Sequence, residues 1–238
     1  MSRPNLRGER GFTLIELLVS ALAGIVVAAA TGAIVIVSIH FSSNFGDRVD
    51  ANQQARVAME KITQALNSSC VSVAVPPILA TGAAPGSVSD ANNAIFYSRL
   101  SALPTINPNQ LIVSYAGGSL TMYTYGPAIG SAPNWTFPTT PATSFVLLPH
   151  AAPQTIAGVA QPVFQYYGYT PGGSTMSATP YATPLSVANA STTAMITISF
   201  QALPTSGNAA TNRGATITTS VVLRLTPASG ATSNTPCG

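Results

Sequence analysis

The chain has 238 residues and a formal net charge of +3 at pH 7, and only 6% of its residues are charged. This length accommodates one domain plus an additional segment. Charge this sparse excludes a nucleic-acid site built from clustered Lys and Arg, so no direct nucleic-acid binding is expected.

The first 40 residues combine a short basic leader with a long apolar segment. The leader, residues 1–11, contains three arginines and ends at Gly11. The 28 residues from Phe12 to Ile39 carry a single charge, on Glu16. This segment is long enough for a transmembrane helix, and the basic leader predicts that the C-terminal domain lies outside the cytoplasm. Glu16 needs an explanation, because an acid inside an apolar helix costs roughly 2.5–3.5 kcal/mol at mid-bilayer.

Two ordinary N-terminal signals account for this pattern less well. A secretory signal peptide has an apolar run of about 7–15 residues without an internal acid, and both expectations fail here, although Ala28-Ala29-Ala30 would satisfy its cleavage rule. A simple signal anchor permits the length but leaves Glu16 unexplained.

The run Gly11-Phe12-Thr13-Leu14-Ile15-Glu16-Leu17-Leu18 resembles the class III signal of type IV prepilins and type II secretion pseudopilins. The resemblance implies that a prepilin peptidase cleaves between Gly11 and Phe12 at the cytoplasmic face and that the new N-terminus on Phe12 is methylated. It also implies that Glu16 neutralises the terminal amine of a neighbouring subunit in a filament. A carboxylate in hydrocarbon is tolerated chiefly when a cation meets it, which agrees with that role.

Residues 41–69 are predicted to continue the transmembrane and assembly helix of residues 12–40 as an amphipathic helix. Apolar residues recur there at the i, i+3, i+4 and i+7 spacing of a buried stripe: Ala55, Ala58, Met59, Ile62, Ala65 and Leu66. Asn67-Ser68-Ser69 ends the pattern, and Pro76-Pro77 prevents its return. A helix from Phe12 to Leu66 would be about 80 Å long, far more than a bilayer's roughly 30 Å core. We therefore expect its second half to pack on a globular head.

Residues 70–238 are predicted to form a β-rich extracytoplasmic head. Strands are expected at residues 94–100, 111–115, 120–125, 163–169, 194–200 and 215–225, with a hairpin turn at 116–119. Residues 126–162 are predicted as loop with one short strand at 145–148, and a second loop is expected from 171 to about 189. The fold class is therefore α+β: a long N-terminal helix packed on one face of a small antiparallel sheet. The resemblance makes this fold pilin-like.

The last strands extend the resemblance toward one branch of the superfamily. The strand at Val163–Tyr167 and the ending Ile217–Arg224 look like J-type pseudopilins and W-type minor pilins. In that group the final strand commonly ends Val-x-Leu-Arg followed by Asn. Leu225 stands here where Asn is usual, so the match to this branch is loose.

Two cysteines, Cys70 after the predicted helix and Cys237 next to the C-terminus, could form a disulfide outside the cytoplasm. The bond would close a loop of 168 residues and contribute roughly 4–5 kcal/mol on the chain-entropy model. The alternative is two unrelated free thiols. Two cysteines without supporting histidines do not make a zinc site of the usual kind, so no metal is expected.

No constellation of catalytic residues is apparent. His40 lies at the predicted membrane edge and His150 in a loop, and Asp90 is the one acid in the head. There is accordingly no carboxylate pair for acid–base work, and the serines lack a Gly-x-Ser-x-Gly setting. The chain is predicted not to be an enzyme and to need no cofactor.

The function that the resemblance implies is that of a minor pilin or pseudopilin subunit in a type IV pilus, a type II secretion pseudopilus or a DNA-uptake filament. Its expected partners are a prepilin peptidase, other pilin or pseudopilin subunits, the inner-membrane assembly platform and the membrane itself. Its expected location is the inner (cytoplasmic) membrane as a single-pass protein, then the filament or cell surface. The alternative is a membrane-anchored extracytoplasmic binding module that is not assembled into a filament.

Overall fold

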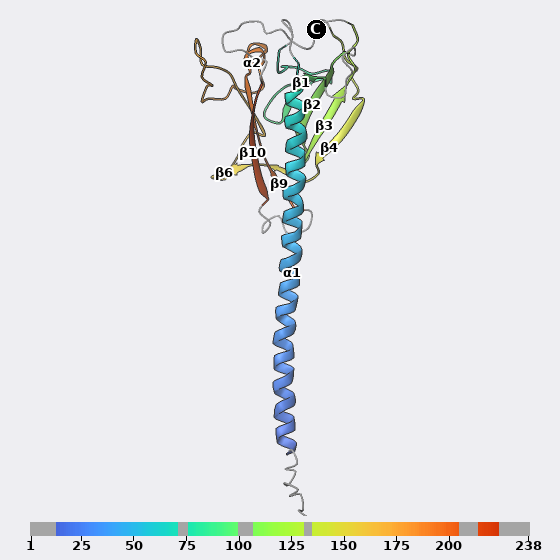
Figure 1. Ribbon diagram of the computed structural model, residues 1–238, viewed down its shortest axis with the longest axis vertical. Helices are drawn as coiled ribbons and strands as arrows, with labels where there is room; N and C mark the ends of the chain where they lie inside the picture. Colours follow the sequence, from blue (N-terminus) through green and yellow to red (C-terminus); the bar gives the residue numbers. More distant parts are fainter. Residues whose placement is uncertain (1–12, 71–75, 100–106, 131–134, 205–213, 224–238) are drawn as a thin grey trace, which may run out of the picture. The chain divides into compact units, whose positions relative to one another are not determined.

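The computed structural model describes residues 13–70, 76–99, 107–130, 135–204 and 214–223 of the chain. It divides into two units, residues 1–46 and 47–238. One 54-residue helix, α1 (Leu14–Asn67), belongs to both units and is uninterrupted (Figure 1). It ends at Asn67, within the Asn67-Ser68-Ser69 segment that the sequence predicts as the end of the helical pattern and two residues before the predicted boundary at residue 69. The strands all belong to the second unit, so the predicted α+β class is confirmed.

Within the second unit, α1 buries one stripe of side chains and exposes the opposite side. The buried stripe contains the six residues predicted from the spacing together with Ala51, and none of the seven is more than 6% exposed. Gln53, Arg56, Glu60 and Gln64 are exposed on the other side. The amphipathic continuation of the helix is therefore confirmed.

The first sheet contains β1 (Asn93–Ser98), β2 (Asn109–Ala116), β3 (Ser119–Tyr125) and β4 (Thr143–Leu148), in that order and antiparallel throughout. The β2–β3 hairpin turns through Gly117 and Gly118, whose φ angles are 58° and 77°. A two-residue turn of this kind needs positive φ at both positions, which glycine adopts without steric cost. The predicted hairpin is confirmed.

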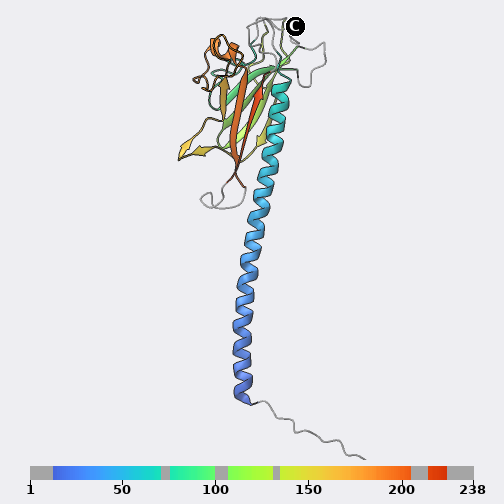
Figure 2. The same cartoon turned by 60° about the vertical axis from the view of Figure 1, so that its left-hand side comes forward.

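The second sheet is arranged around a central strand, β9 (Met195–Ala202). On one side β9 pairs with β10 (Ala215–Val222), and on the other with β5 (Ala151–Pro153) and β8 (Phe164–Tyr167), again antiparallel. In both ribbon views β10 lies beside the head portion of α1 (Figures 1 and 2). A separate hairpin of β6 (Thr155–Ile156) and β7 (Val159–Ala160) projects from this half of the head.

Three details of the predicted head are wrong. The described strands form two four-stranded sheets and one two-stranded sheet rather than one small sheet. Residues 126–162 contain β5, β6 and β7 as well as β4, and the predicted loop at 171–189 runs into a short helix, α2 (Val187–Thr192). These elements depend on contacts that periodicity does not encode: β5 is an Ala-Ala-Pro segment that pairs with β9, and α2 is capped by the Ser186 side chain.

One hydrophobic core joins α1 to both sheets. Its largest fully buried side chains come from three strands: Phe96, Phe164, Tyr166 and Phe200. The Tyr166 hydroxyl donates hydrogen bonds to the carbonyl oxygens of Asp90 (3.2 Å) and Asn93 (2.5 Å). Burial, with a smaller effect of the Asp90 charge, raises the pKa of Tyr166 well above its usual value, so the hydroxyl keeps the proton that it donates.

The other face of the first sheet is also covered. Leu79, Ile95, Ile112 and Tyr125 form a second buried cluster there. Tyr97 extends it by stacking on Phe137 at 5.0 Å between ring centroids and by an edge contact with Trp135 at 5.6 Å. The first sheet therefore has apolar packing on both faces, with only one of them against α1.

Candidate functional site

The start of α1 is organised by Thr13 and Glu16. A carboxylate oxygen of Glu16 accepts hydrogen bonds from the Thr13 backbone N–H (3.2 Å) and hydroxyl (3.1 Å). In return the Glu16 backbone N–H donates to the Thr13 hydroxyl oxygen at 3.4 Å. This reciprocal arrangement, with Thr at the N-cap and Glu three residues later, is a capping box. Glu16 thus satisfies a donor at the start of its own helix.

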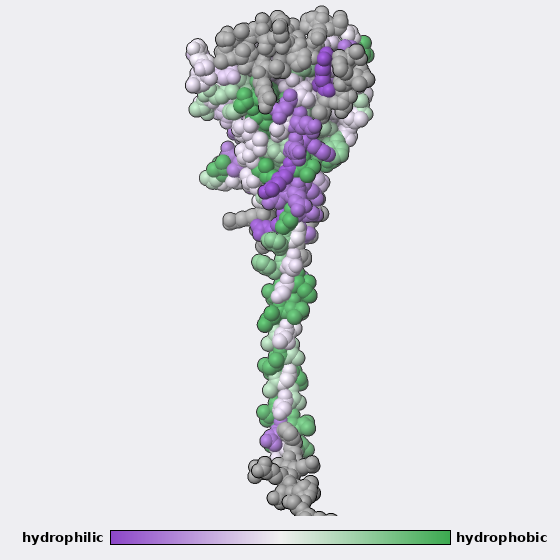
Figure 3. Space-filling model, viewed as in Figure 1, coloured by the Kyte–Doolittle hydropathy of each residue, from purple (hydrophilic) through white to green (hydrophobic). Residues whose placement is uncertain are grey.

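The following residues of α1 present apolar side chains on all sides. Leu14 is 83% exposed and Phe41 75%, and Figure 3 shows the hydrophobic colouring along this part of the helix. Hydroxyls in the segment bond to its own backbone: Ser20 donates to the Glu16 carbonyl and Ser38 to that of Ile34. Such bonds leave little polar surface to desolvate. By length and composition, α1 could cross a membrane.

Glu16 is the only acidic or basic residue between Thr13 and Gly46, apart from His40. The sequence analysis singles out Glu16 by its charge but does not predict its hydrogen-bond partner, Thr13. The signal was present, since Thr13-Leu14-Ile15-Glu16 has the Thr-x-x-Glu spacing of a capping box. Gly11 and Phe12, the predicted cleavage and methylation residues, lie outside the described residues, so their roles stay predictions.

Cys70 lies just past the end of α1 and is 1% exposed. Its backbone N–H donates to the Tyr97 carbonyl at 3.1 Å, which fixes it against β1. It is not a free thiol. Cys237 lies outside the described residues, so the Cys70–Cys237 pair stays a prediction.

Mass spectrometry of the exported protein, digested without reduction, should show a peptide that joins Cys70 to Cys237. Cys237→Ser would remove this disulfide, and we expect the substitution to lower the free energy of unfolding by about 2–5 kcal/mol, since the loop that the bond closes is long. Alkylation of both thiols in the unreduced protein would contradict the pairing.

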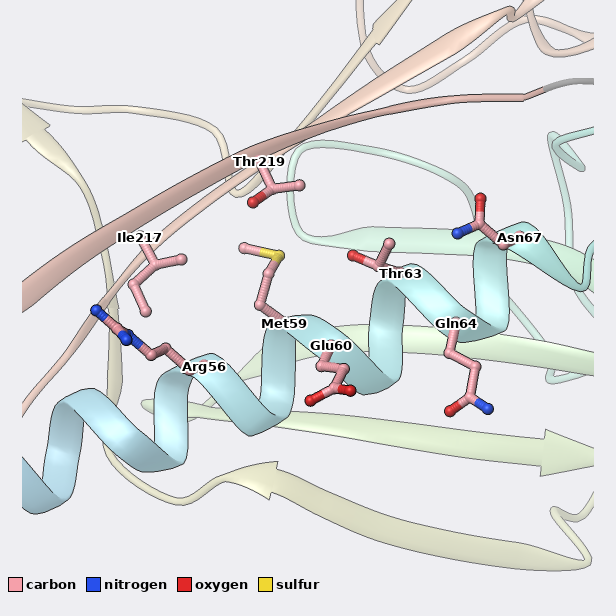
Figure 4. Close-up of a pocket in the computed structure, with 8 residues that line it drawn as sticks. All are labelled: Arg56, Met59, Glu60, Thr63, Gln64, Asn67, Ile217 and Thr219. Carbon is pink, nitrogen blue, oxygen red and sulfur yellow. The ribbon is translucent and has the colours of Figure 1, made fainter.

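A groove lies on the head between α1 and β10. It has a volume of about 550 Å³. Figure 4 shows the eight side chains that line it: Arg56, Met59, Glu60, Thr63, Gln64, Asn67, Ile217 and Thr219. Met59 and Ile217 are its apolar residues, and the rest are polar or charged. No sequence pattern predicts this groove, because it depends on where β10 passes α1.

Charges are concentrated on the same part of α1. Residues 47–61 contain six of the fifteen acidic and basic residues of the chain: Asp47, Arg48, Asp50, Arg56, Glu60 and Lys61. Three are positive and three negative, so the segment has no net charge. The ammonium group of Lys61 lies 3.8 Å from the centre of the Phe145 ring on β4, a cation–π contact that ties it to the head. Figure 3 shows hydrophilic colouring gathered on this part of the molecule.

The described residues show no arrangement that resembles a catalytic or metal centre. No three of their His, Cys, Asp and Glu side chains gather closely enough to hold a metal ion. Asp90 has a structural role, since one carboxylate oxygen accepts the backbone N–H groups of Asn92 (2.7 Å) and Asn93 (2.8 Å) in the turn before β1. That the chain is not an enzyme stays a prediction.

Comparison with known proteins adds no assignment. No family model matches the chain, and no curated protein or solved structure matches it either.

Proposed function

We propose that the chain is a minor pilin or pseudopilin subunit. A prepilin peptidase cleaves it after Gly11, the new N-terminus on Phe12 is methylated, and the mature subunit enters a type IV pilus or a type II secretion pseudopilus. Before assembly it is a single-pass protein of the inner membrane whose head is outside the cytoplasm. Its partners are the peptidase, other pilin-type subunits and the assembly platform.

One observation carries this proposal: the unbroken run Gly11–Leu18 places a single acid, Glu16, at the start of a long apolar helix. In lipid this carboxylate is costly unless a cation meets it. Cleavage after Gly11 creates such a cation, the amine of Phe12. Two further features support the proposal: α1 is a continuous helix of 54 residues, and its C-terminal part packs on a β-rich head.

The capping box favours a second candidate, a membrane-anchored binding module that never joins a filament. Because Glu16 already accepts the Thr13 backbone N–H, it has a local role that needs no neighbouring subunit. On this alternative the leader is not removed, and the N-terminus lies in the cytoplasm as part of a plain anchor.

Processing separates the two candidates. Co-expression with an active prepilin peptidase should shorten the chain by the 11 residues of the leader, and N-terminal peptide mapping should begin at methylated Phe12. Gly11→Ala should slow or block the cleavage, while Gly24→Ala, a matched change inside α1 where an added Cβ meets no neighbouring atom, should leave it unchanged. An unaltered mass beside an active peptidase would remove the basis of the proposed function.

A further inference from the structure

We propose that the outer edge of β10 is a docking site for an extended segment of another protein, which adds to the second sheet as a further strand. The segment that fits is uncharged and alternates apolar residues with serine or threonine. The site lies entirely within the unit formed by residues 47–238. This inference goes beyond the proposed function and does not depend on it, since a filament subunit and a membrane-anchored module would both carry this edge.

The backbone groups of β10 divide between its two edges. In β9 the Ser199 N–H donates to the Val163 carbonyl at 2.9 Å, on the side of β8. Bond direction alternates along an antiparallel strand, so the next residue, Ile198, bonds to its partner on β10, Thr219. The alternate residues of β10 therefore point their N–H and C=O groups away from β9, and their side chains are exposed: Thr216, Thr218 and Ser220. Among the residues that the structure describes, none pairs with this edge.

Two other edges of the four-stranded sheets are covered by the chain itself. At the outer edge of β1, the Tyr97 carbonyl accepts the Cys70 N–H at 3.1 Å. At the outer edge of β8, the Tyr166 carbonyl accepts the Tyr181 N–H at 2.8 Å. Neither edge can take a further strand without giving up these bonds.

The two remaining edges, those of β5 and β4, are short or irregular. β5 has three residues and ends in Pro153, and its Ala151 N–H already bonds to the Gly118 carbonyl at 2.7 Å. The pairing of β4 with β3 shifts its register once, and the Lys61 ammonium group lies against Phe145 of β4. Proline, irregular pairing, a nearby lysine and short length are the features by which proteins protect sheet edges from pairing.

β10 has none of these protective features. It is eight residues long, contains no charged residue and no proline, and pairs with β9 without a register shift. A regular strand with an unpaired row of N–H and C=O groups is a template for another strand. Peptide recognition by strand addition uses such an edge, with backbone bonds that provide affinity and side-chain pockets that provide specificity.

The groove supplies the side-chain pocket for this edge. Residues of β10 and α1 line it and residues of β9 do not, so it lies on the side of β10 away from β9. In Figure 4 the Met59 side chain projects from α1 toward Ile217 and Thr219 of β10. The two charged residues of the lining, Arg56 and Glu60, have opposite signs. A strand added at the edge would bring alternate side chains into this groove, where Met59 and Ile217 favour apolar ones.

β9 shows which kind of sequence β10 accepts as a partner. On one face, the Thr197 and Ser199 hydroxyls bond to those of Ser220 (2.8 Å) and Thr218 (2.9 Å). On the other face, the alternate residues of β9 are fully buried and apolar: Ile196, Ile198 and Phe200. An incoming strand with the same alternation places apolar side chains on the groove side and hydroxyls beside Thr218 and Ser220.

A fluorescent peptide that copies β9, Met195–Ala202, with a short lysine tail for solubility, tests the site on the full-length chain in lipid nanodiscs. Thr218→Pro removes one outward N–H and leaves the bonds to β9 in place, because proline is tolerated on the open side of an edge strand. Thr218→Val is the matched control, since it loses the same hydroxyl and keeps the N–H. Fluorescence anisotropy, corrected for empty nanodiscs, should show the peptide Kd raised about tenfold by proline and by less than about twofold by valine.

Two further measurements keep the test decisive if the proline variant fails to fold, which limited proteolysis would show. Thr63→Arg places a long charged side chain in the groove without altering β10, and it should also weaken peptide binding about tenfold. Peptides N-methylated on one or the other set of alternate residues can pair through one edge only. One set should abolish binding and the other should preserve it, because a single edge of the peptide faces β10.

Equal binding by the wild-type, Thr218→Pro and Thr63→Arg chains, or equal binding of both N-methylated peptides, would show that the peptide attaches by apolar contact elsewhere and would overturn this inference. Lack of binding to the wild-type chain would overturn it as well, including the case in which residues 224–238 of the same chain occupy the edge. None of these outcomes bears on cleavage at Gly11, so the proposed function is tested separately.

Discussion

Replacing Ile62 by aspartate is expected to unfold the head and to leave the apolar half of α1 able to insert into membranes. Ile62 is fully buried in the core that α1 shares with both sheets. Loss of its side chain volume alone costs about 2–5 kcal/mol, and an unpaired buried charge adds several more. The sum is comparable with the whole stability of a typical domain, about 5–15 kcal/mol.

Val57→Asp is the matched control, since Val57 lies on the same helix and is 52% exposed. The substitution has a similar helix propensity cost, but the new carboxylate stays in water, so we expect a change within about 0.5 kcal/mol. Limited proteolysis of the full-length membrane-bound chain would measure both variants. Equal resistance of the Ile62→Asp and wild-type heads would show that the stripe is not the core of this fold.

A helix or strand of this fold is predictable from the sequence when apolar residues recur along it at a regular spacing. Sequence periodicity predicts the elements along which apolar residues recur at helical or alternating spacing. These are the buried stripe of α1 and the strands β1, β2, β3, β8, β9 and β10. β5 and the β6–β7 hairpin have no such alternation, and they are strands only because of pairing or a tight turn. The division into two sheets is likewise a property of the packed molecule.

The candidate functional residues likewise include some that the sequence predicts and some that depend on the packed structure. Glu16 was identifiable from the sequence because a lone charge in an apolar run is costly wherever it lies. Its bond to Thr13 is local and was also encoded, as the Thr-x-x-Glu spacing. The groove could not be predicted, because Ile217 and Thr219 are about 160 residues from Arg56 and Met59 along the chain and meet them only in the packed head.

The assembly role proposed for Glu16 predicts that Glu16→Val enters filaments poorly. Membrane insertion should persist, because the substitution removes a charge from lipid, and cleavage should persist, because the peptidase site is at Gly11. Each neighbouring Phe12 amine would be left buried without its counter-charge, a loss of about 3–5 kcal/mol per contact. An immunoblot of the sheared fraction, normalised to the inserted and cleaved pool, measures this effect.

The capping box makes the valine variant insufficient by itself, because valine also removes the acceptor for the Thr13 backbone N–H. Glu16→Gln resolves the ambiguity. Glutamine has the same length and still accepts that hydrogen bond, as either Glu or Gln completes a capping box, but it has no charge. If the charge drives assembly, the glutamine variant should fail nearly as completely as the valine variant.

The capping role and the charge-neutralising role of Glu16 also differ in the free energy at stake, so a partial loss of filament incorporation can be assigned to one of them. Loss of a cap costs about 0.5–2 kcal/mol, whereas an uncompensated buried charge costs about 3–5 kcal/mol at every subunit contact. Thr13→Val gives the converse variant, because it removes the hydroxyl of the cap and keeps the carboxylate of Glu16; we expect it to assemble. Normal incorporation of Glu16→Gln together with failure of Glu16→Val would assign Glu16 to helix capping alone and would favour the membrane-anchored module over the filament subunit.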